Sequence, residues 1–277
     1  MTQLWPPVHA SWVGARHAAR GEGCQDASLS HSGTLADGDS YSLIVVADGH
    51  GDSRHHRSAV GSQLACVVAA ELVQEAAADQ GTDWQRWWGD HFASAVVARW
   101  RQRCQQDHGQ RGEGDGFSPI PYGTTLGVAL LSRHWWACAG IGDWSMAQIT
   151  ATQARVVSQE PPQPGGGEAT YSLCMEEPAA LIRERCQWHR HDDPDGFALV
   201  LTTDGVHKSC LSIHDYLVLC HYLAKEGLPP PQRDEAVDLQ AALAQITREG
   251  VGDDVSVAVG ACGALVLSGE LPSTAIA

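Results

Sequence analysis

The chain has 277 residues, of which 33 are acidic and 18 basic, so its formal net charge is −15. A chain of this length buries a full core without metal or disulfide staples, and a hydrophobic fraction of 43% excludes wholesale disorder. The negative charge argues against nucleic acid or an anionic membrane surface as a partner. Nine scattered cysteines without a Cys-x-x-C pair fit reduced thiols and a cytoplasmic protein.

The longest nearly apolar run covers 255–267, and Ser256, Gly260 and Gly263 interrupt it. A run this short and this interrupted does not span a bilayer. The first residues lack the basic and apolar regions of a signal peptide, so we expect no secretory signal. We therefore expect neither a membrane nor nucleic acid among the partners.

The first half of the chain predicts one buried strand and two helices. The apolar, β-branched run 41–47 predicts the strand. Asp52 or Ser53 can cap the helix that follows, in which apolar residues share one face. A second helix is predicted over 83–107, and the Gly-rich, charged segment 109–121 predicts a loop.

Strands dominate the middle of the chain. The apolar runs 124–131 and 135–141 are separated by a short polar segment, which favours a hairpin. Further strands are predicted over 144–150 and 154–157. The stretch 159–195 is rich in Pro, Gly and charge, which predicts a long surface excursion, and such excursions are often functional.

The last third of the chain again predicts strands separated by two helices. It predicts a buried strand over 197–203, helices over 212–225 and 234–249, and one or two closing strands over 255–267. Strands that follow one another without a helix between them favour antiparallel pairing. The order of elements therefore predicts an α+β fold with sheets inside and helices outside.

Acidic residues stand at the ends of the predicted strands. Asp48, Asp143 and Asp204 each follow an apolar strand and are joined to a glycine, whereas Asp253 and Asp254 begin the last strand. If that strand runs antiparallel to the others, these distant carboxylates meet at one edge. Packed carboxylates repel one another, and lysine is almost absent nearby, so Mg²⁺ or Mn²⁺ is the natural partner. Any one such Asp taken alone is more often a turn or cap residue.

A histidine lies next to the first of these acids. In Asp48-Gly49-His50-Gly51, the imidazole of His50 could act as a general acid near neutral pH. The alternative is a solvated loop histidine, the commoner fate in a chain with fourteen of them. Phosphate-binding P-loops, nucleophile elbows and the cysteine loop of other phosphatases are missing from the sequence.

Six short motifs resemble those of the metal-dependent, 2C-type serine/threonine protein phosphatases, in the order of that family. They are Gln25-Asp26-Ala27, Val46-Ala47-Asp48-Gly49-His50-Gly51, Gly123-Thr124-Thr125, Gly140-Ile141-Gly142-Asp143, Leu201-Thr202-Thr203-Asp204-Gly205-Val206 and Gly252-Asp253-Asp254-Val255-Ser256-Val257. The early Cys24-Gln25-Asp26 is similar to that of a bacterial subgroup.

The resemblance implies a four-layer α-β-β-α sandwich, in which two antiparallel sheets are flanked by helix pairs. We expect this single domain to cover 1–268 and a loosely held tail to cover 269–277. The excursion 159–195 falls where the family carries its flap, a region linked to substrate choice.

The resemblance also implies two Mn²⁺ or Mg²⁺ ions, whose bridging water attacks phosphorus in line without a covalent enzyme intermediate. By position, Asp48 would bridge both ions, and the Gly49 carbonyl, Asp204 and Asp253 would complete their ligands. Asp143, with Asp204, would hold a weaker third ion.

Two further residues take catalytic roles by the same resemblance. Asp26 would orient waters on the metals, and His50 would protonate the leaving Ser or Thr alkoxide. The implied substrates are phosphoproteins, with a Ser/Thr kinase as a candidate partner.

The chain departs from the family pattern at two positions. Gln25 stands where the family usually has Glu, and Gly21 stands where the family has a phosphate-binding Arg. Arg16 and Arg20 lie nearby and could replace that arginine, because a guanidinium fork suits phosphate.

The sequence leaves three functions to compare. The first is a Mn²⁺- or Mg²⁺-dependent phosphoserine/phosphothreonine phosphatase. The alternative, motivated by Gln25 and Gly21, is a pseudophosphatase or regulatory binding module that acts on a partner kinase. A hydrolase of small phosphomonoesters would use the same acids.

Overall fold

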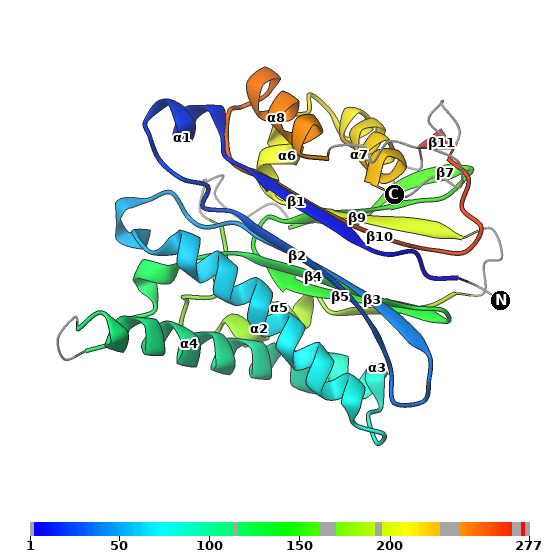
Figure 1. Ribbon diagram of the computed structural model, residues 1–277, viewed down its shortest axis with the longest axis horizontal. Helices are drawn as coiled ribbons and strands as arrows, with labels where there is room; N and C mark the ends of the chain where they lie inside the picture. Colours follow the sequence, from blue (N-terminus) through cyan, green and yellow to red (C-terminus); the bar gives the residue numbers. More distant parts are fainter. Residues whose placement is uncertain are drawn as a thin grey trace.

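Two sheets packed face to face form the centre of the molecule, and helices cover both outer faces (Figure 1). The computed structural model describes residues 3–112, 116–160, 170–191, 196–227, 239–267 and 273–274. In the six-stranded sheet the order is β1 (Val8–Trp12), β10 (Val255–Cys262), β9 (Phe197–Thr202), β6 (Ser145–Ile149), β7 (Gln153–Ser158) and β11 (Ser273–Thr274). In the five-stranded sheet it is β2 (Ala27–Thr34), β3 (Ser40–Ala47), β4 (Leu126–Ser132), β5 (Trp135–Ile141) and β8 (Gln187–Arg190).

The main helices form pairs on the outer faces, α2 with α4 and α7 with α8 (Figure 1). The longer ones are α2 (Ser58–Ala78), α4 (Ala93–Gln110), α7 (Ile213–Gly227) and α8 (Leu239–Glu249). The shorter ones are α1 (Ala15–Ala19), η1 (Ser53–His55), α3 (Trp84–Arg86), η2 (Trp87–Phe92), η3 (Ile120–Tyr122), α5 (Pro178–Glu184) and α6 (Asp204–Lys208). The predicted four-layer α+β sandwich is confirmed. Every strand pair is antiparallel except the short β7–β11 contact.

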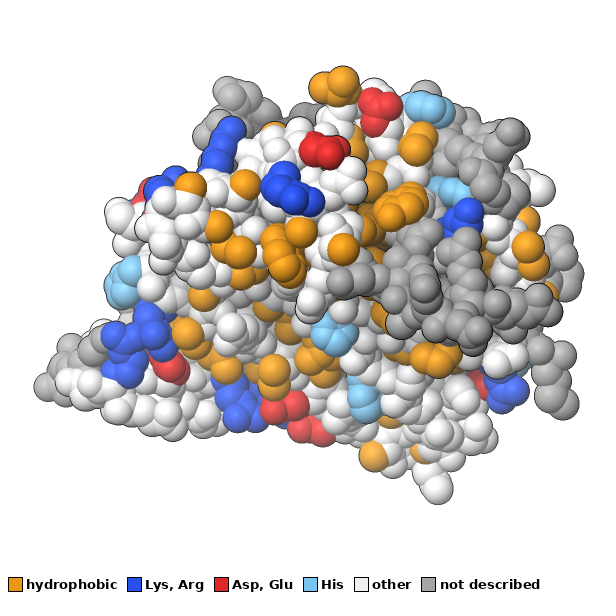
Figure 2. All heavy atoms as spheres, turned by 45° about the horizontal axis from the view of Figure 1, so that its top comes forward, with side chains coloured by type: hydrophobic (Ala, Val, Ile, Leu, Met, Phe, Trp, Pro, Cys, Tyr) orange, Lys and Arg blue, Asp and Glu red, His pale blue; other side chains and the backbone are white. Residues whose placement is uncertain are grey.

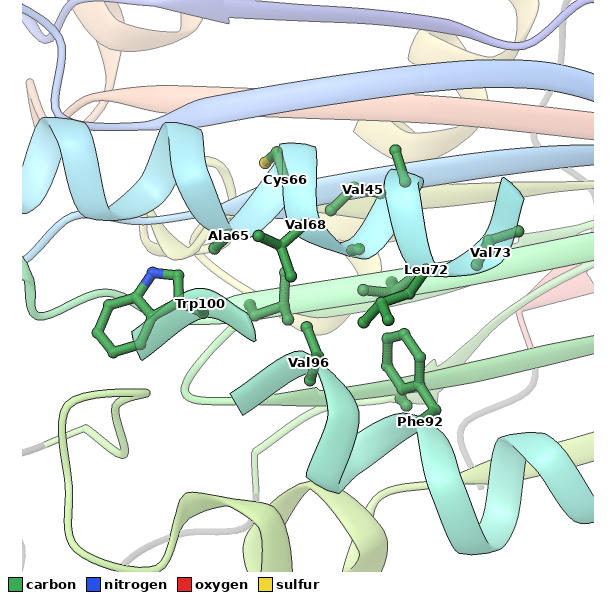
Figure 3. Packing of buried hydrophobic residues seen from close by; sticks show 14 of the residues in the cluster. Val45, Ala65, Cys66, Val68, Leu72, Val73, Phe92, Val96 and Trp100 are labelled. Atoms are coloured by element: carbon green, nitrogen blue, oxygen red, sulfur yellow. The ribbon is translucent and has the colours of Figure 1, made fainter. Parts of the chain in front are cut away.

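The alternation of β3 explains why this run of apolar residues is buried on both faces. Val45 packs toward α2 and α4, whereas Ile44 and Val46 face the other sheet. Figure 3 shows Leu72 of α2 and Phe92, at the start of α4, in the outer layer of this core. Each buried side chain of this size contributes about 2 kcal/mol through burial, so the strand is fixed from both sides.

Several predicted elements differ from the observed ones. The helix predicted over 83–107 is interrupted by a π-helical turn, η2. The predicted loop 109–121 contains η3 at its end. The stretch 159–195 is more than a surface excursion, because it contains α5 and also β8, which pairs with β5. Its segments 161–169 and 192–195 lie outside the described residues.

The C-terminal part also differs from the prediction. The segment 255–267 forms one strand, β10, which ends at Cys262. Residues 234–238 of the last predicted helix lie outside the described residues, as does the predicted tail 269–277 except for β11. The strands β1 and β2 were not predicted. Among the described residues, no helix combines the length and apolarity that a membrane span requires.

Figure 2 shows one face of the surface. On it, the lysine and arginine side chains of the described residues stand singly or in small groups among apolar and uncharged atoms. A nucleic-acid-binding surface carries its basic residues in a patch or stripe.

Candidate metal centre

Three strand ends bring carboxylates together at one edge of the sandwich. Asp48 follows β3, Asp143 lies after β5, and Asp204 follows β9 closely and begins α6. Both β3 and β5 pair antiparallel with β4, so their carboxyl ends lie on the same side of the sheet. One oxygen of each carboxylate lies within 4.8 Å of the others. The structure thus brings these three predicted residues into one group.

Asp253 approaches the same place from the start of the last strand. Because β10 pairs antiparallel with β9, its beginning lies beside the end of β9. Asp253 lines a cavity of about 1010 Å³ together with Asp48, Asp143 and Asp204. The compact group among the described residues nevertheless contains three acids, and Asp253 stands in the cavity wall beside it.

Burial makes the charged forms of these acids costly. It raises the pKa of Asp48 and of Asp26 well above the usual range, and neighbouring carboxylates add to the effect. Burial and Asp204 raise the pKa of Asp143 to about 7. Burial would also raise the pKa of Asp204, but the neighbouring carboxyl of Asp48 and the ammonium of Lys208 hold it below the usual value.

Lys208 corrects the expectation that lysine is almost absent from this region and leaves the acids without a basic partner. Its ammonium donates to Oδ2 of Asp204 and lies 3.9 Å from Oδ2 of Asp143. The sequence contained the signal for this contact, because Lys208 follows Asp204 by one helical turn. The acid group is therefore partly compensated by the chain itself.

The remaining buried oxygens test whether the site fits a metal. Oδ1 of Asp204, Oδ1 of Asp26 and Oε1 of Gln25 are buried without a hydrogen-bond partner. Oδ2 of Asp26, in contrast, accepts a hydrogen bond of 2.7 Å from Thr203. A buried oxygen without a hydrogen-bond donor lowers the stability of the fold. Oxygen donors around a cavity suit a hard divalent cation, so the residues present fit Mg²⁺ or Mn²⁺.

Position 49 requires glycine because two other backbone segments lie very close to it. A Cβ at this position would lie 2.6 Å from the carbonyl oxygen of Gln25 and 2.9 Å from the backbone of Ser58. Gly49 forms an isolated bridge with Thr124, and both Gly49 and its neighbour His50 line the cavity. The glycine thus lets the loop after β3 lie against the acid group.

His50 lines the cavity, and burial is the main influence on its ring. Its backbone N–H donates to the carbonyl of Gly123 at 3.1 Å, and its ring lies 5.0 Å from that of His55. Burial, helped by His55, lowers the pKa of His50 to about 4. The imidazole is therefore neutral at pH 7 in the structure.

The family profile described as Protein phosphatase 2C matches residues 13–244. The chain belongs to this family. A search among curated protein sequences found no match.

Solved 2C-type phosphatases share the fold. A bacterial serine phosphatase is 13% identical with a TM-score of 0.61, covering 96% of this chain and 100% of its own. The catalytic domain of the serine/threonine phosphatase PstP, in complex with two manganese ions, is 15% identical with a TM-score of 0.58, over 95% and 100% of the two chains. The serine/threonine phosphatase of S. agalactiae is 16% identical with a TM-score of 0.58, over 94% and 99%.

The arginines proposed for phosphate line the cavity of this 2C phosphatase. Arg16 packs its side chain near Gly252, and Arg20 forms a 2.7 Å ion pair with Glu22 on the exposed rim. Gly21, which replaces the family's arginine, has a φ of +72°. A side chain is strained in that left-handed conformation, which gives a physical reason for the missing arginine.

Sequence reasoning missed the contacts of one cavity residue, Asp254, and the place of another, Arg54. Asp254 was counted among the acids of the site, but its carboxylate accepts from the backbone N–H groups of Gly14 and Gln25 at 2.5 and 2.6 Å, and lies 2.9 Å from His17. Arg54 also lines the cavity and pairs with Asp52 at 3.1 Å. The partners of Asp254 are far away in sequence, so no local pattern indicates them.

Proposed function

We propose that this protein is a divalent-metal-dependent phosphatase that hydrolyses phosphoserine and phosphothreonine in proteins. The observation that carries the proposal is the compact group of Asp48, Asp143 and Asp204, in which Oδ1 of Asp204 is buried without a partner. Membership of the 2C family supports the reaction class, and the relative PstP is described with two manganese ions.

Asp48, the Gly49 carbonyl, Asp204 and Asp253 would hold two Mn²⁺ or Mg²⁺ ions, and Asp143 stands beside them. When bound, such ions supply a water nucleophile at neutral pH and stabilise charge on phosphoryl oxygens. The proposed reaction needs no covalent enzyme intermediate.

Asp26 and His50 would serve the water and the leaving group. Thr203 holds Oδ2 of Asp26, which fixes the carboxylate and leaves Oδ1 free to accept from a water. His50 would give a proton to the leaving Ser or Thr oxygen. Its pKa is low in the absence of substrate, and the negative phosphate would favour the protonated imidazole.

The rim of the cavity would bind the phosphorylated peptide. Arg16 and Arg20 stand on the α1 side, and each guanidinium can bind phosphate oxygens in pairs. Such a cavity, with polar walls and about 1010 Å³ in volume, leaves room for residues that flank the phosphorylated side chain. A Ser/Thr kinase that forms these phosphoproteins is the proposed functional partner.

A cytoplasmic location forms part of the proposal. All nine cysteines lie within the described residues and form no disulfide there, and several are buried in the core. Thiols in this number without a disulfide suit a reducing compartment.

The test is hydrolysis of p-nitrophenyl phosphate and of a phosphothreonine peptide, with Mn²⁺ and with EDTA. We expect Mn²⁺-dependent turnover that Asp48→Asn lowers more than about 100-fold. Mutating a residue that only supports a metal ligand already lowers activity by up to about 100-fold, and Asp48 would be a ligand itself. Asp90→Asn is the matched control, since Asp90 is exposed and forms an ion pair with Arg86 on the surface.

Two outcomes would contradict the proposal. Full activity in EDTA would exclude metal-dependent chemistry. A folded wild type that binds Mn²⁺ without turnover would favour the regulatory module suggested by Gln25 and Gly21.

A further inference from the structure

Lys208 meets two of the acids at the candidate metal centre. The turn α6 begins at Asp204, so Lys208 lies one turn later on the same face. Its ammonium donates to Oδ2 of Asp204 and lies 3.9 Å from Oδ2 of Asp143. The ammonium therefore stands between two carboxylates that come from different sheets.

The burial of these groups shows that the contact is more than a surface ion pair. The side chain of Asp204 is 10% exposed and that of Asp143 26%, whereas that of Lys208 is 57% exposed. Lysine occurs only twice in the chain, at 208 and 225. A lysine ammonium is a compact point charge, and it takes oxygen neighbours much as a small cation does.

The two oxygens of Asp204 have different surroundings. Oδ2 accepts from Lys208, but Oδ1 is buried without a partner. Oδ1 thus remains available to an ion on the side of Asp48. The side toward Asp143 already holds a positive charge.

We propose that the ammonium of Lys208 takes the place of a third divalent cation between Asp143 and Asp204. The inference rests on the proposed function, because it concerns the ions of that site. A divalent ion at this position would lie against a fixed positive charge and share its oxygens, so Lys208 excludes it. The protein then holds one ion fewer than its acids could bind.

The ammonium of Lys208 also affects the stability of the protein when no metal is bound. Chelation removes ions but leaves Lys208 in place, so Asp143 and Asp204 stay compensated. Without the ammonium, the buried carboxylate of Asp204 and the half-buried one of Asp143 would repel each other.

The experiment counts Mn²⁺ bound per chain after equilibrium dialysis, by elemental analysis of the full chain. Lys208→Met removes the charge and keeps most of the aliphatic stem, Lys208→Arg keeps the charge, and Lys225→Met is the matched control. We expect Lys208→Met to bind about one Mn²⁺ more than the wild type, and the other two variants to match the wild type. Equal binding by Lys208→Met and the wild type would overturn the inference.

Thermal unfolding in EDTA gives a second readout that needs no turnover. We expect Lys208→Met to melt at a lower temperature than the wild type and Lys208→Arg to melt close to it. A Lys208→Met variant as stable as the wild type in EDTA would also overturn the inference. If Lys208→Met does not fold, the count is made with Lys208→Gln, which has lost the charge but still donates hydrogen bonds.

Hydrolysis of p-nitrophenyl phosphate by the wild type separates the two proposals. If the wild type hydrolyses the substrate and Lys208→Met binds no extra ion, only the role of Lys208 is rejected. If Lys208→Met binds an extra ion and the wild type shows no hydrolysis, the role of Lys208 is supported and the proposed function is rejected.

Discussion

At the scale of single residues, Asp254 has a structural task beside the acids of the site. Its carboxylate is 3% exposed and accepts from the N–H groups of Gly14 and Gln25, and His17 lies beside it. These contacts join the start of β10 to the segments before α1 and before β2. The carboxylate of Asp254 therefore helps to hold the α1 side of the cavity, which carries Arg16 and Arg20.

We expect Asp254→Ala to lower the free energy of unfolding by about 3 kcal/mol, because it leaves two buried N–H groups without acceptors. Urea denaturation monitored by tryptophan fluorescence measures the change. Asp90→Ala, on the exposed surface, should change stability by less than about 0.5 kcal/mol. A loss as small in Asp254→Ala as in the control would show that these hydrogen bonds do not hold the segment.

Residues of the site differ in how far the sequence predicts them. Asp48, Asp143 and Asp204 were predictable, because each follows an apolar strand and joins a glycine. Lys208 was predictable in principle from its spacing to Asp204. The role of Asp254 was not, because its partners are brought to it only by the tertiary fold.

At the scale of elements, α2 lies close to the backbone of η3 and to α4. A Cβ on Gly61 of α2 would lie 1.9 Å from the carbonyl oxygen of Tyr122. The carbonyl of Gly61 also accepts a 2.9 Å hydrogen bond from the indole of Trp100 in α4. Glycine at this position therefore lets α2 lie directly against the backbone of η3. Figure 3 shows Trp100, the partner of the Gly61 carbonyl, beside α2.

We expect Gly61→Ala to destabilise the protein by more than about 2 kcal/mol, since the added methyl overpacks a rigid backbone contact. Gly89→Ala is the control, because nothing lies within 4 Å of a Cβ there, and alanine is the better helix former. Urea midpoints of the two variants give the comparison. Equal midpoints would mean that α2 shifts at little cost.

The elements also show why some strands were missed. The strands β3, β9 and β10 are buried on both faces and read as apolar runs. The strand β2 alternates serine with other residues, and β8 has only four residues, so neither has a strong pattern. Their pairing with β3 and β5 is supplied by the tertiary fold.

At the scale of the whole molecule, the candidate metal centre lies at the junction of the two sheets. Asp48 and Asp143 follow strands of the five-stranded sheet, whereas Asp204 comes after β9 and Asp253 comes before β10, which are both strands of the six-stranded sheet. An ion held by both pairs would bind the folded protein and not the unfolded chain. Metal binding should therefore stabilise the whole fold.

We expect saturating Mn²⁺ to raise the melting temperature of the wild type by about 5 °C relative to EDTA, since a ligand at 100 times its Kd adds about 2.7 kcal/mol. Asp204→Asn should lose most of this shift, and Asp90→Asn should keep it. Differential scanning calorimetry measures both. An Asp204→Asn variant that responds like the wild type would place the ion elsewhere.

The strand order has a consequence for synthesis on the ribosome. In the six-stranded sheet, β10 lies between β1 and β9, although β1 is near the start of the chain. During translation, β1 cannot pair with β10 until β10 has emerged from the ribosome, and such long-range pairing is slow. The six-stranded sheet, and with it the position of Asp253, can form only late. The candidate metal centre of a nascent chain therefore stays incomplete until β10 has been made.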